Sequence, residues 1–190
     1  MSDAKPPRLV VCLTGMPGAG KSTSAEVAEP LGFKVFRMGD DVRMEAEKRK
    51  IPPTDENLGA IMLQLRQAGG IVAIAILCKQ RIEKDKSKLI LIDGVRNINE
   101  FFEFKKLGMA VLVTIHATPE RRFQFLKARG RADSPQSFQS FEARDRRELT
   151  VGIGEAIALA DEVIVNGGSI DDLKKESLAL VKRLKDNFSA

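Results

Sequence analysis

The feature that most constrains this chain is a glycine-rich segment near its start, G-M-P-G-A-G-K-S at residues 15–22. It matches the pattern G-x-x-x-x-G-K-[ST] in full, and a chain of this length and composition would contain such a match by chance about once in a hundred sequences. An apolar run, L-V-V-C-L-T, precedes the segment, and a stretch of helical spacing follows it. Phosphate-binding loops connect a strand to a helix in this way, so we expect residues 15–22, here called the phosphate loop, to bind phosphate groups through backbone amides.

Individual residues of the phosphate loop suit separate tasks. Gly18 and Gly20 leave room for inward-pointing amides, Lys21 is placed to reach the outer phosphates, and the hydroxyl of Ser22 suits Mg²⁺. Asp93 ends a later apolar run, where its carboxylate would hold the same metal; its alternative role is an ordinary turn with the glycine that follows. The nucleotide-binding positions predicted in this segment are Gly15, Met16, Pro17, Gly18, Ala19, Gly20, Lys21, Ser22 and Thr23.

Five short apolar runs alternate along the chain with longer stretches of helical spacing. Apolar runs separated by helices are typical of a parallel sheet, so we predict an α/β fold with five parallel strands. The strands are expected at residues 9–14, 34–38, 89–93, 110–116 and 162–165. Connecting helices are expected at 22–31, where Pro30 should fray the end, and at about 171–185, with Ser169 as the cap.

Two segments interrupt this alternation within what we expect to be a single domain, residues 1–190. Residues 38–85 are too long for one crossover, and their capping residues, Pro pair and Gly pair predict an insertion of three helices. The capping candidates are Asp40, Asp41 and Thr54. Residues 129–141 are polar and weakly periodic, which favours a mobile flap.

Charge and composition narrow the partners that such a fold would bind. The chain has 31 Lys and Arg against 26 Asp and Glu, a net charge of +5, which favours anionic partners such as nucleotides or nucleic acid. Trp and Tyr are absent, so bases could stack only on Phe, and nucleic acid is the less favoured partner. The longest apolar run has eight residues, against about 20 for a membrane span. With no recognisable secretion signal, we expect a cytoplasmic protein without a membrane partner.

Three motifs together resemble the nucleoside monophosphate kinase superfamily, and adenylate kinase in particular: the phosphate loop, M-G-D-D-V-R at 38–43 and I-D-G-V-R at 92–96. The ending A-D-E-V-I-V-N-G-G-S at 160–169 is similar to dephospho-coenzyme A kinase, and the whole chain resembles an archaeal group of adenylate-kinase-related proteins. The resemblance implies a P-loop kinase fold with a core at 7–37, 86–128 and 149–190, an acceptor-binding helical insertion at 38–85, and a short lid at 129–148. It further implies phosphoryl transfer from ATP, with Mg²⁺, to a nucleotide or nucleotide-like small molecule by a monomer or homodimer.

The resemblance also implies roles for individual residues outside the phosphate loop. Arg43 and Arg96 would bind the acceptor phosphate, because one guanidinium can bind two phosphate oxygens. Phe125, Asn166 and Gly167 would lie near the donor base. The lid would contribute four arginines that neutralise charge on the transferred group: Arg129, Arg131, Arg144 and Arg147.

Two positions leave the nature of the acceptor open. Glu100 is predicted to lie in the substrate site, where it replaces the glutamine that reads the acceptor adenine in adenylate kinase. The resemblance therefore does not identify AMP as the acceptor. Asp40, with Asp41 beside it in the substrate site, could take the proton of a hydroxyl acceptor, whereas a phosphate acceptor needs no base. The alternative for at least one of the two aspartates is a structural role, as the cap of a helix at Val42.

Several alternatives stay open from the sequence alone. Arg43 and Arg96 could be solvated or paired with carboxylates, and residues 166–168 could form an ordinary turn. The lid arginines could instead form helix-surface ion pairs with Glu142, Asp145 and Glu148. For function, the alternatives are phosphorylation of a hydroxyl, as in dephospho-coenzyme A kinase, and a regulatory NTPase that binds nucleic acid or a protein partner.

Overall fold

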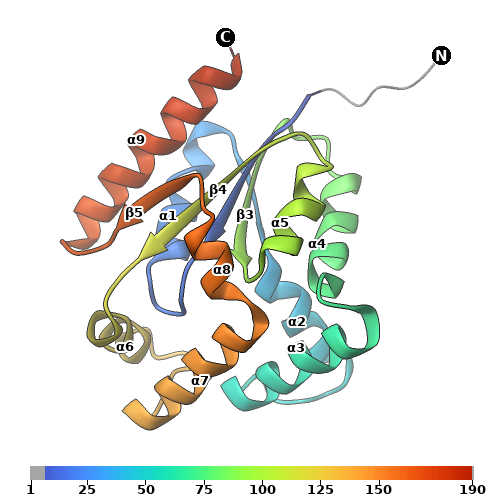
Figure 1. Ribbon diagram of the computed structural model, residues 1–190, viewed down its shortest axis with the longest axis vertical. Coiled ribbons are helices and arrows are strands. Elements are labelled where there is room, and N and C mark those ends of the chain that lie inside the picture. The colour runs from blue at the N-terminus through green and yellow to red at the C-terminus, as the bar shows by residue number, and fades with distance from the viewer. Residues whose placement is uncertain (1–6, 190) are drawn as a thin grey trace.

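Five parallel strands form the single sheet of the computed structural model, which describes residues 7–189 (Figure 1). They are β1 (Leu9–Thr14), β2 (Lys34–Arg37), β3 (Leu89–Val95), β4 (Met109–His116) and β5 (Glu162–Val165). Their order across the sheet is β2-β3-β1-β4-β5, and every neighbouring pair is parallel. This confirms the predicted α/β fold with five parallel strands. The ends of the predicted domain, residues 1–6 and 190, lie outside the described residues.

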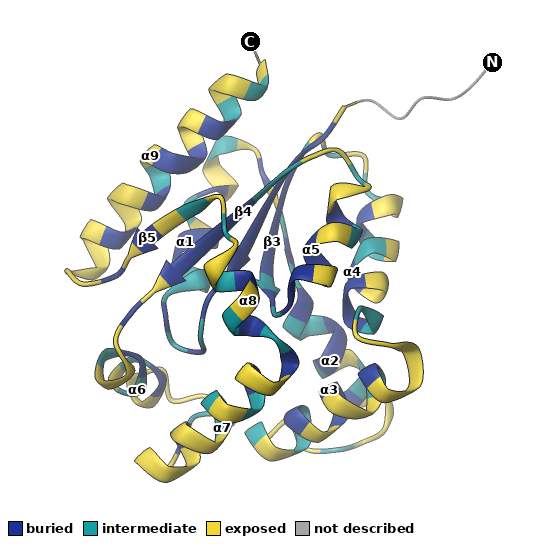
Figure 2. Cartoon of the chain, in the orientation of Figure 1, coloured by how far each residue is buried: buried dark blue, intermediate teal, exposed yellow. Residues whose placement is uncertain are grey.

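The central strand β1 is buried on both of its faces, which explains why its sequence is apolar without alternation. Val10 and Cys12 pack into the core on one side of the sheet. Leu9, Val11 and Leu13 point to the other side and pack into a second core. All five side chains are almost fully buried (Figure 2).

Helices cover both faces of this sheet. They are α1 (Lys21–Glu26), α2 (Met38–Lys48), α3 (Asp55–Gly69), α4 (Ala73–Lys84), α5 (Ile98–Lys105), α6 (Pro119–Ala128), α7 (Phe138–Val151), α8 (Ile153–Ala158) and α9 (Ile170–Ser189). Figure 1 shows α1 and α9 together on one face and α5 and α8 on the other. The three helices α2, α3 and α4 fill the long connection between β2 and β3, which confirms the predicted helical insertion.

Local capping chemistry sets some of the helix boundaries. The Thr54 hydroxyl accepts a hydrogen bond from the Asn57 amide at the start of α3 (3.3 Å). At the start of α9, the Ser169 hydroxyl accepts one from the Asp172 amide (3.1 Å). Both are the N-cap interactions expected of these residue types, so the two predicted caps are confirmed.

Other predicted boundaries were wrong. The first helix ends at Glu26 rather than at residue 31, because Pro30 lies in a separate 3₁₀ turn, Glu29–Leu31. Met38 begins α2 instead of ending β2, so Asp40 and Asp41 lie within the first turn of α2 and do not cap a helix beginning at Val42. The last four residues of the predicted flap are also regular: α7 begins at Phe138 behind a Ser137 capping box, and the irregular segment is confined to residues 129–137.

The assignment of the insertion to acceptor binding and of residues 129–148 to a lid stays a prediction. Within residues 7–189, none of the helices is both long enough and apolar enough to cross a membrane alone. The bent pair α3 and α4 would meet that length and composition only if both helices were counted together.

Candidate functional site

A cleft of about 920 Å³ lies where β1 and β3 end, between the phosphate loop, the start of α2 and the segment that follows α6. Ligands of open parallel sheets bind at the carboxyl ends of the strands, so this is the expected place for a site. Most of the predicted site residues line it: Gly15, Pro17, Gly18, Gly20, Lys21, Ser22, Thr23, Asp40, Arg43, Asp93, Arg96, Phe125, Arg129, Arg131, Arg144 and Asn166. A smaller pocket of about 60 Å³ shares walls with the cleft and is lined by Arg147. The predicted residues outside both linings are Met16, Ala19, Asp41, Glu100 and Gly167.

The shape of the phosphate loop depends on its glycines. Gly15, Gly18 and Gly20 have φ angles of 133°, 81° and 111°, which side chains with a Cβ atom rarely adopt. A Cβ atom at Gly15 would lie 2.2 Å from the carbonyl oxygen of Ile115, and one at Gly18 would lie 2.6 Å from that of Arg122. The loop is therefore bare backbone pressed against β4 and α6, as a backbone cradle for phosphate requires.

Lys21 folds back over this loop. Its Nζ atom donates hydrogen bonds to the carbonyl oxygens of Gly15 (2.6 Å) and Met16 (3.1 Å). Burial lowers the pKa of Lys21 to about 8, although the Asp93 carboxylate opposes this shift. An ammonium that is poorly solvated and held only by carbonyls gains much from a phosphate oxygen, so the site is prepared for an anionic ligand.

Ser22 and Asp93 form the candidate metal position. The Ser22 hydroxyl donates a hydrogen bond to Asp93 Oδ2 (3.1 Å), and Asp93 is buried. One hydroxyl and one carboxylate are oxygen ligands of the kind that Mg²⁺ takes from a protein when phosphates and waters supply the rest. The residues thus fit the metal. The alternative turn role of Asp93 is wrong, because β3 continues through it to Val95.

Two arginines from different elements line the cleft. Arg43, in α2, donates a hydrogen bond to Asp40 (3.2 Å), and its side chain is 41% exposed. Arg96, just after β3, is ion-paired with the buried Glu148 of α7. Burial opposes ionisation of Arg96, but the Glu148 carboxylate outweighs it and raises the pKa of the guanidinium. Both arginines are therefore paired with carboxylates of the protein.

Three of the four predicted lid arginines, Arg129, Arg144 and Arg147, are also paired with carboxylates. Arg129 contacts Asp133 (3.0 Å), and Arg144 donates a hydrogen bond to the backbone oxygen of Asp133 (2.8 Å). Arg144 and Arg147 both contact Asp55 at the start of α3, at 3.1 and 2.8 Å. The alternative prediction paired the lid arginines with Glu142, Asp145 and Glu148 of α7. Those partners were wrong, because Asp55 and Asp133 lie outside α7. One aspartate of the helical insertion thus contacts two arginines of the lid.

Asp41 and Glu100 lie behind the cleft rather than in it. Asp41 accepts a hydrogen bond from Arg81 (2.7 Å), and burial raises its pKa against the effect of that arginine. Glu100 is completely buried; it binds the guanidinium of Arg66 (2.6 Å) and the backbone amide of Arg96 (2.7 Å). The structure thus corrects the expectation that these two carboxylates face a substrate, and gives them roles in supporting the walls.

Of the three residues predicted to lie near the donor base, two line the cleft and one does not. Phe125 lines the cleft, and the guanidinium of Arg121 lies 5.4 Å from its ring centroid. Asn166 lines the cleft too, but its Nδ2 atom donates to the Ala19 carbonyl (2.9 Å) and so ties β5 to the phosphate loop. Gly167 is exposed outside the cleft. Phe125 is thus the aromatic surface available beside the phosphate loop.

Sequence reasoning missed Asp55 and Asp133, and it named Glu148 as a possible partner of the lid arginines rather than of Arg96. Asp55, Asp133 and Glu148 each neutralise an arginine of the cleft or its adjoining pocket. Asp133 is four positions from Arg129, a spacing that could have indicated their contact, whereas Asp55 and Arg147 are 92 positions apart. No local pattern could have indicated the contact of Asp55.

Comparison with known proteins defines the class to which this fold and site belong. Residues 14–142 match the family described as AAA domain. A shikimate kinase from Acinetobacter baumannii, solved with shikimate, aligns over 94% of this chain and 95% of its own, with a TM-score of 0.58 and 18% identity. A gluconokinase from Sinorhizobium meliloti aligns over 97% of both chains, with a TM-score of 0.57 and 17% identity. These structures share the fold, and the protein is a P-loop protein with the fold of such kinases.

Closer relatives identify the family. The chain is 41% identical over 177 residues to a UPF0200 protein of Hyperthermus butylicus, covering 93% of this chain and 95% of that protein. It is also 41% identical over 183 residues to a UPF0200 protein of Methanocaldococcus jannaschii, covering 95% and 92%. The protein belongs to the UPF0200 family. This confirms the predicted resemblance to an archaeal group of P-loop, kinase-like proteins.

Proposed function

We propose that this protein transfers the terminal phosphoryl group of ATP, in the presence of Mg²⁺, to a nucleotide or nucleotide-like small molecule bound in the cleft. The observation that carries the proposal is the meeting of three groups in one cavity. The phosphate loop with Lys21 forms one wall, the Ser22–Asp93 pair lies beside it, and arginines from separate elements face it. Those arginines are Arg43, Arg96, Arg129, Arg131 and Arg144.

This arrangement matches what phosphoryl transfer needs from a protein. The transferred group carries dispersed negative charge, so catalysis consists mainly of positioning and charge neutralisation. The loop amides and Lys21 would hold the donor, and the guanidinium groups would orient the acceptor. Bound Mg²⁺, held by Ser22 and Asp93, would neutralise charge on the phosphates. Arg43, Arg96, Arg129 and Arg144 would each exchange a protein carboxylate for a phosphate oxygen.

A second candidate is transfer to a hydroxyl group. Asp40 favours it, because its carboxylate lines the cleft whereas that of Asp41 does not. A carboxylate in this place could accept the proton that a hydroxyl loses as it attacks phosphorus. An acceptor that is already a phosphate has no proton to lose, so Asp40 would contribute little to that reaction.

A screen of acceptors tests the proposed function. Purified protein with Mg-ATP is given the common nucleoside monophosphates, nucleosides and dephospho-coenzyme A, and products are read by mass spectrometry. We expect one acceptor class to gain a phosphoryl group, and Lys21→Ala to lower the rate at least about a hundredfold. The matched control is Lys48→Ala, since the Lys48 side chain is 80% exposed. Absence of any product, or equal rates for Lys21→Ala and the wild type, would refute the proposal.

Asp40→Asn then separates the two acceptor classes. For a hydroxyl acceptor we expect kcat to fall by a factor of about 10² or more, because the base is lost. For a phosphate acceptor we expect kcat to change less than about threefold. The product mass identifies the acceptor independently, so the two measurements must agree.

A further inference from the structure

Arg122, in α6, is a buried arginine that neither the cleft nor the predicted site includes. Only 4% of its surface is exposed. Its guanidinium donates hydrogen bonds to the carbonyl oxygens of Pro17 and Ala117, both at 3.2 Å, and to the two carboxylate oxygens of Asp145 at 2.8 and 2.6 Å. It also lies 4.8 Å from the ring centroid of Phe141. One cation therefore joins the phosphate loop, the end of β4 and α7.

The bond to Asp145 controls which way α7 faces. Successive residues of a helix are turned by about 100°, so Arg144 and Arg147, three positions apart, share one face, while Asp145 points to another. Asp145 is held against α6 by two parallel hydrogen bonds, a geometry that resists rotation as well as translation. With Asp145 held in this way, Arg144 points into the cleft and Arg147 into the adjoining pocket.

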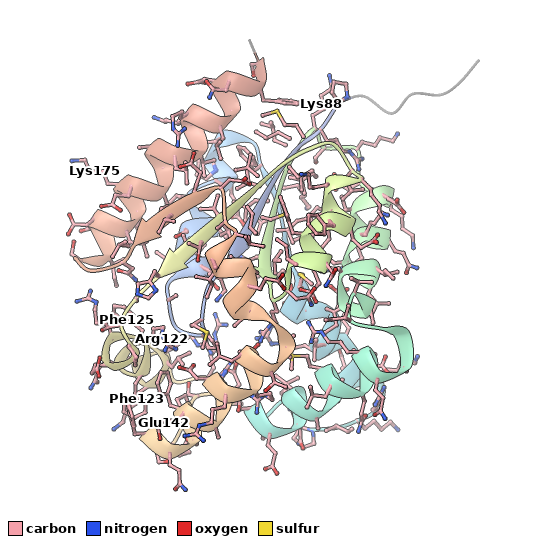
Figure 3. The ribbon with its side chains drawn as sticks, in the orientation of Figure 1. Lys88, Arg122, Phe123, Phe125, Glu142 and Lys175 are labelled. Atoms are coloured by element: carbon pink, nitrogen blue, oxygen red, sulfur yellow. The ribbon has the colours of Figure 1, made fainter. Side chains whose placement is uncertain are left out.

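Arg122 also holds the phosphate loop, through its hydrogen bond to the Pro17 carbonyl oxygen. The loop also packs on the Arg122 backbone, since a Cβ atom at Gly18 would lie 2.6 Å from the Arg122 carbonyl oxygen. Figure 3 shows Arg122 in α6, above the Glu142 end of α7 and close to the phosphate loop. A change in the shape of the loop is therefore passed to the same guanidinium that holds α7.

We propose that Arg122 is a positioning residue that couples occupancy of the phosphate loop to the placement of α7 and its arginines. It lines neither the cleft nor the adjoining pocket. The importance of this coupling for catalysis rests on the proposed function, but the coupling itself requires only that the loop bind a nucleotide. The Arg122–Asp145 bond is partly buried and bidentate, so breaking it should uncouple the two elements even where the fold survives.

Hydrogen exchange measured with a non-transferable nucleotide tests this inference without an acceptor. Amide exchange of residues 138–151 is compared with and without the β,γ-methylene analogue of ATP and Mg²⁺. The analogue should slow exchange in this segment at least about tenfold in the wild type. In Asp145→Asn and Arg122→Lys, which keep shape or charge but weaken the bidentate bond, analogue affinity should change less than tenfold while the added protection disappears. The control is Arg146→Gln, an exposed neighbour on α7.

Each result has a defined meaning. Retained protection in either variant, or no protection of residues 138–151 in the analogue-bound wild type, would overturn the coupling. Failure of the wild type to bind the analogue would overturn both the coupling and the proposed function. Coupling observed in a protein that phosphorylates no acceptor would leave the role of Arg122 standing and refute only the proposed function. If both variants fail to fold, the wild-type measurement still tests the coupling, because absence of added protection in residues 138–151 would overturn it.

Discussion

Lys21→Met should stabilise the ligand-free protein while abolishing nucleotide binding. Burial lowers the pKa of Lys21 from its ordinary 10.5 to about 8, with Asp93 acting in the opposite direction. At pH 7 the lysine is protonated in both the folded and the unfolded chain, so the folded state bears the cost of its charge. The difference of about 2.5 pH units, at about 1.36 kcal/mol per unit, corresponds to about 3 kcal/mol.

Part of this gain is offset by lost hydrogen bonds. The Gly15 carbonyl would lose the donor that Lys21 supplies, which costs about 1–2 kcal/mol. The Met16 carbonyl keeps a hydrogen bond from the Ala19 amide (3.1 Å). The net expectation is a variant more stable by about 1–2 kcal/mol, and a chain of this size gains about 2–4 °C in Tm per kcal/mol. We therefore expect Tm to rise by about 2–8 °C at pH 7.

The pH dependence provides the sharper test. Between pH 8 and 10.5 the unfolded chain holds the Lys21 proton while the folded chain releases it, so this residue makes the wild type more stable as pH rises. Lys21→Met lacks this contribution, and its advantage should shrink over the same range. Thermal unfolding by circular dichroism at pH 7 and pH 10 measures both effects. The exposed-residue control Lys48→Met should change the free energy of unfolding by less than about 0.5 kcal/mol.

Two outcomes would refute this reasoning. If Lys21→Met melts at or below the wild-type temperature at pH 7, burial of the ammonium does not destabilise the free protein. If the difference in Tm between the two proteins is the same at pH 7 and pH 10, the pKa of Lys21 is not lowered. Calorimetric titration with ATP should separately show that binding is lost in Lys21→Met and kept in Lys48→Met.

Three further predictions concern the carboxylates. Glu100→Ala leaves buried Arg66 unpaired, so we expect the free energy of unfolding, measured with denaturant, to fall by about 3–5 kcal/mol while ATP affinity stays unchanged. A stable variant with weakened acceptor binding would contradict the structural role of Glu100. Asp55→Asn removes the carboxylate that competes with phosphate for Arg144, so ATP or pyrophosphate should bind up to about tenfold more tightly by calorimetry; weaker binding would argue against competition. Asp93→Asn should raise the Mg²⁺ concentration needed for activity about tenfold or more without changing metal-free nucleotide affinity, and an unchanged Mg²⁺ requirement would exclude this residue as a ligand.

The sequence by itself determined the phosphate loop and the class of fold. Both depend on contacts within a few residues: glycines permit the positive φ angles of the loop, and continuous apolar runs such as that of β1 require a strand buried on both faces. The insertion could also be predicted, because Pro and Gly pairs break helices wherever they lie. These features depend little on how distant segments pack.

Tertiary structure alone decided which charged side chains face the cleft. Asp40 and Asp41 are adjacent in the first turn of α2, which begins at Met38. Because α4 packs against α2, Asp41 accepts a hydrogen bond from Arg81, whereas Asp40 lines the cleft. Asp55 reaches Arg147 across 92 positions of sequence. The physical reason is that local backbone geometry is set by neighbouring residues, whereas a buried charge must find its partner on whichever element the fold brings beside it.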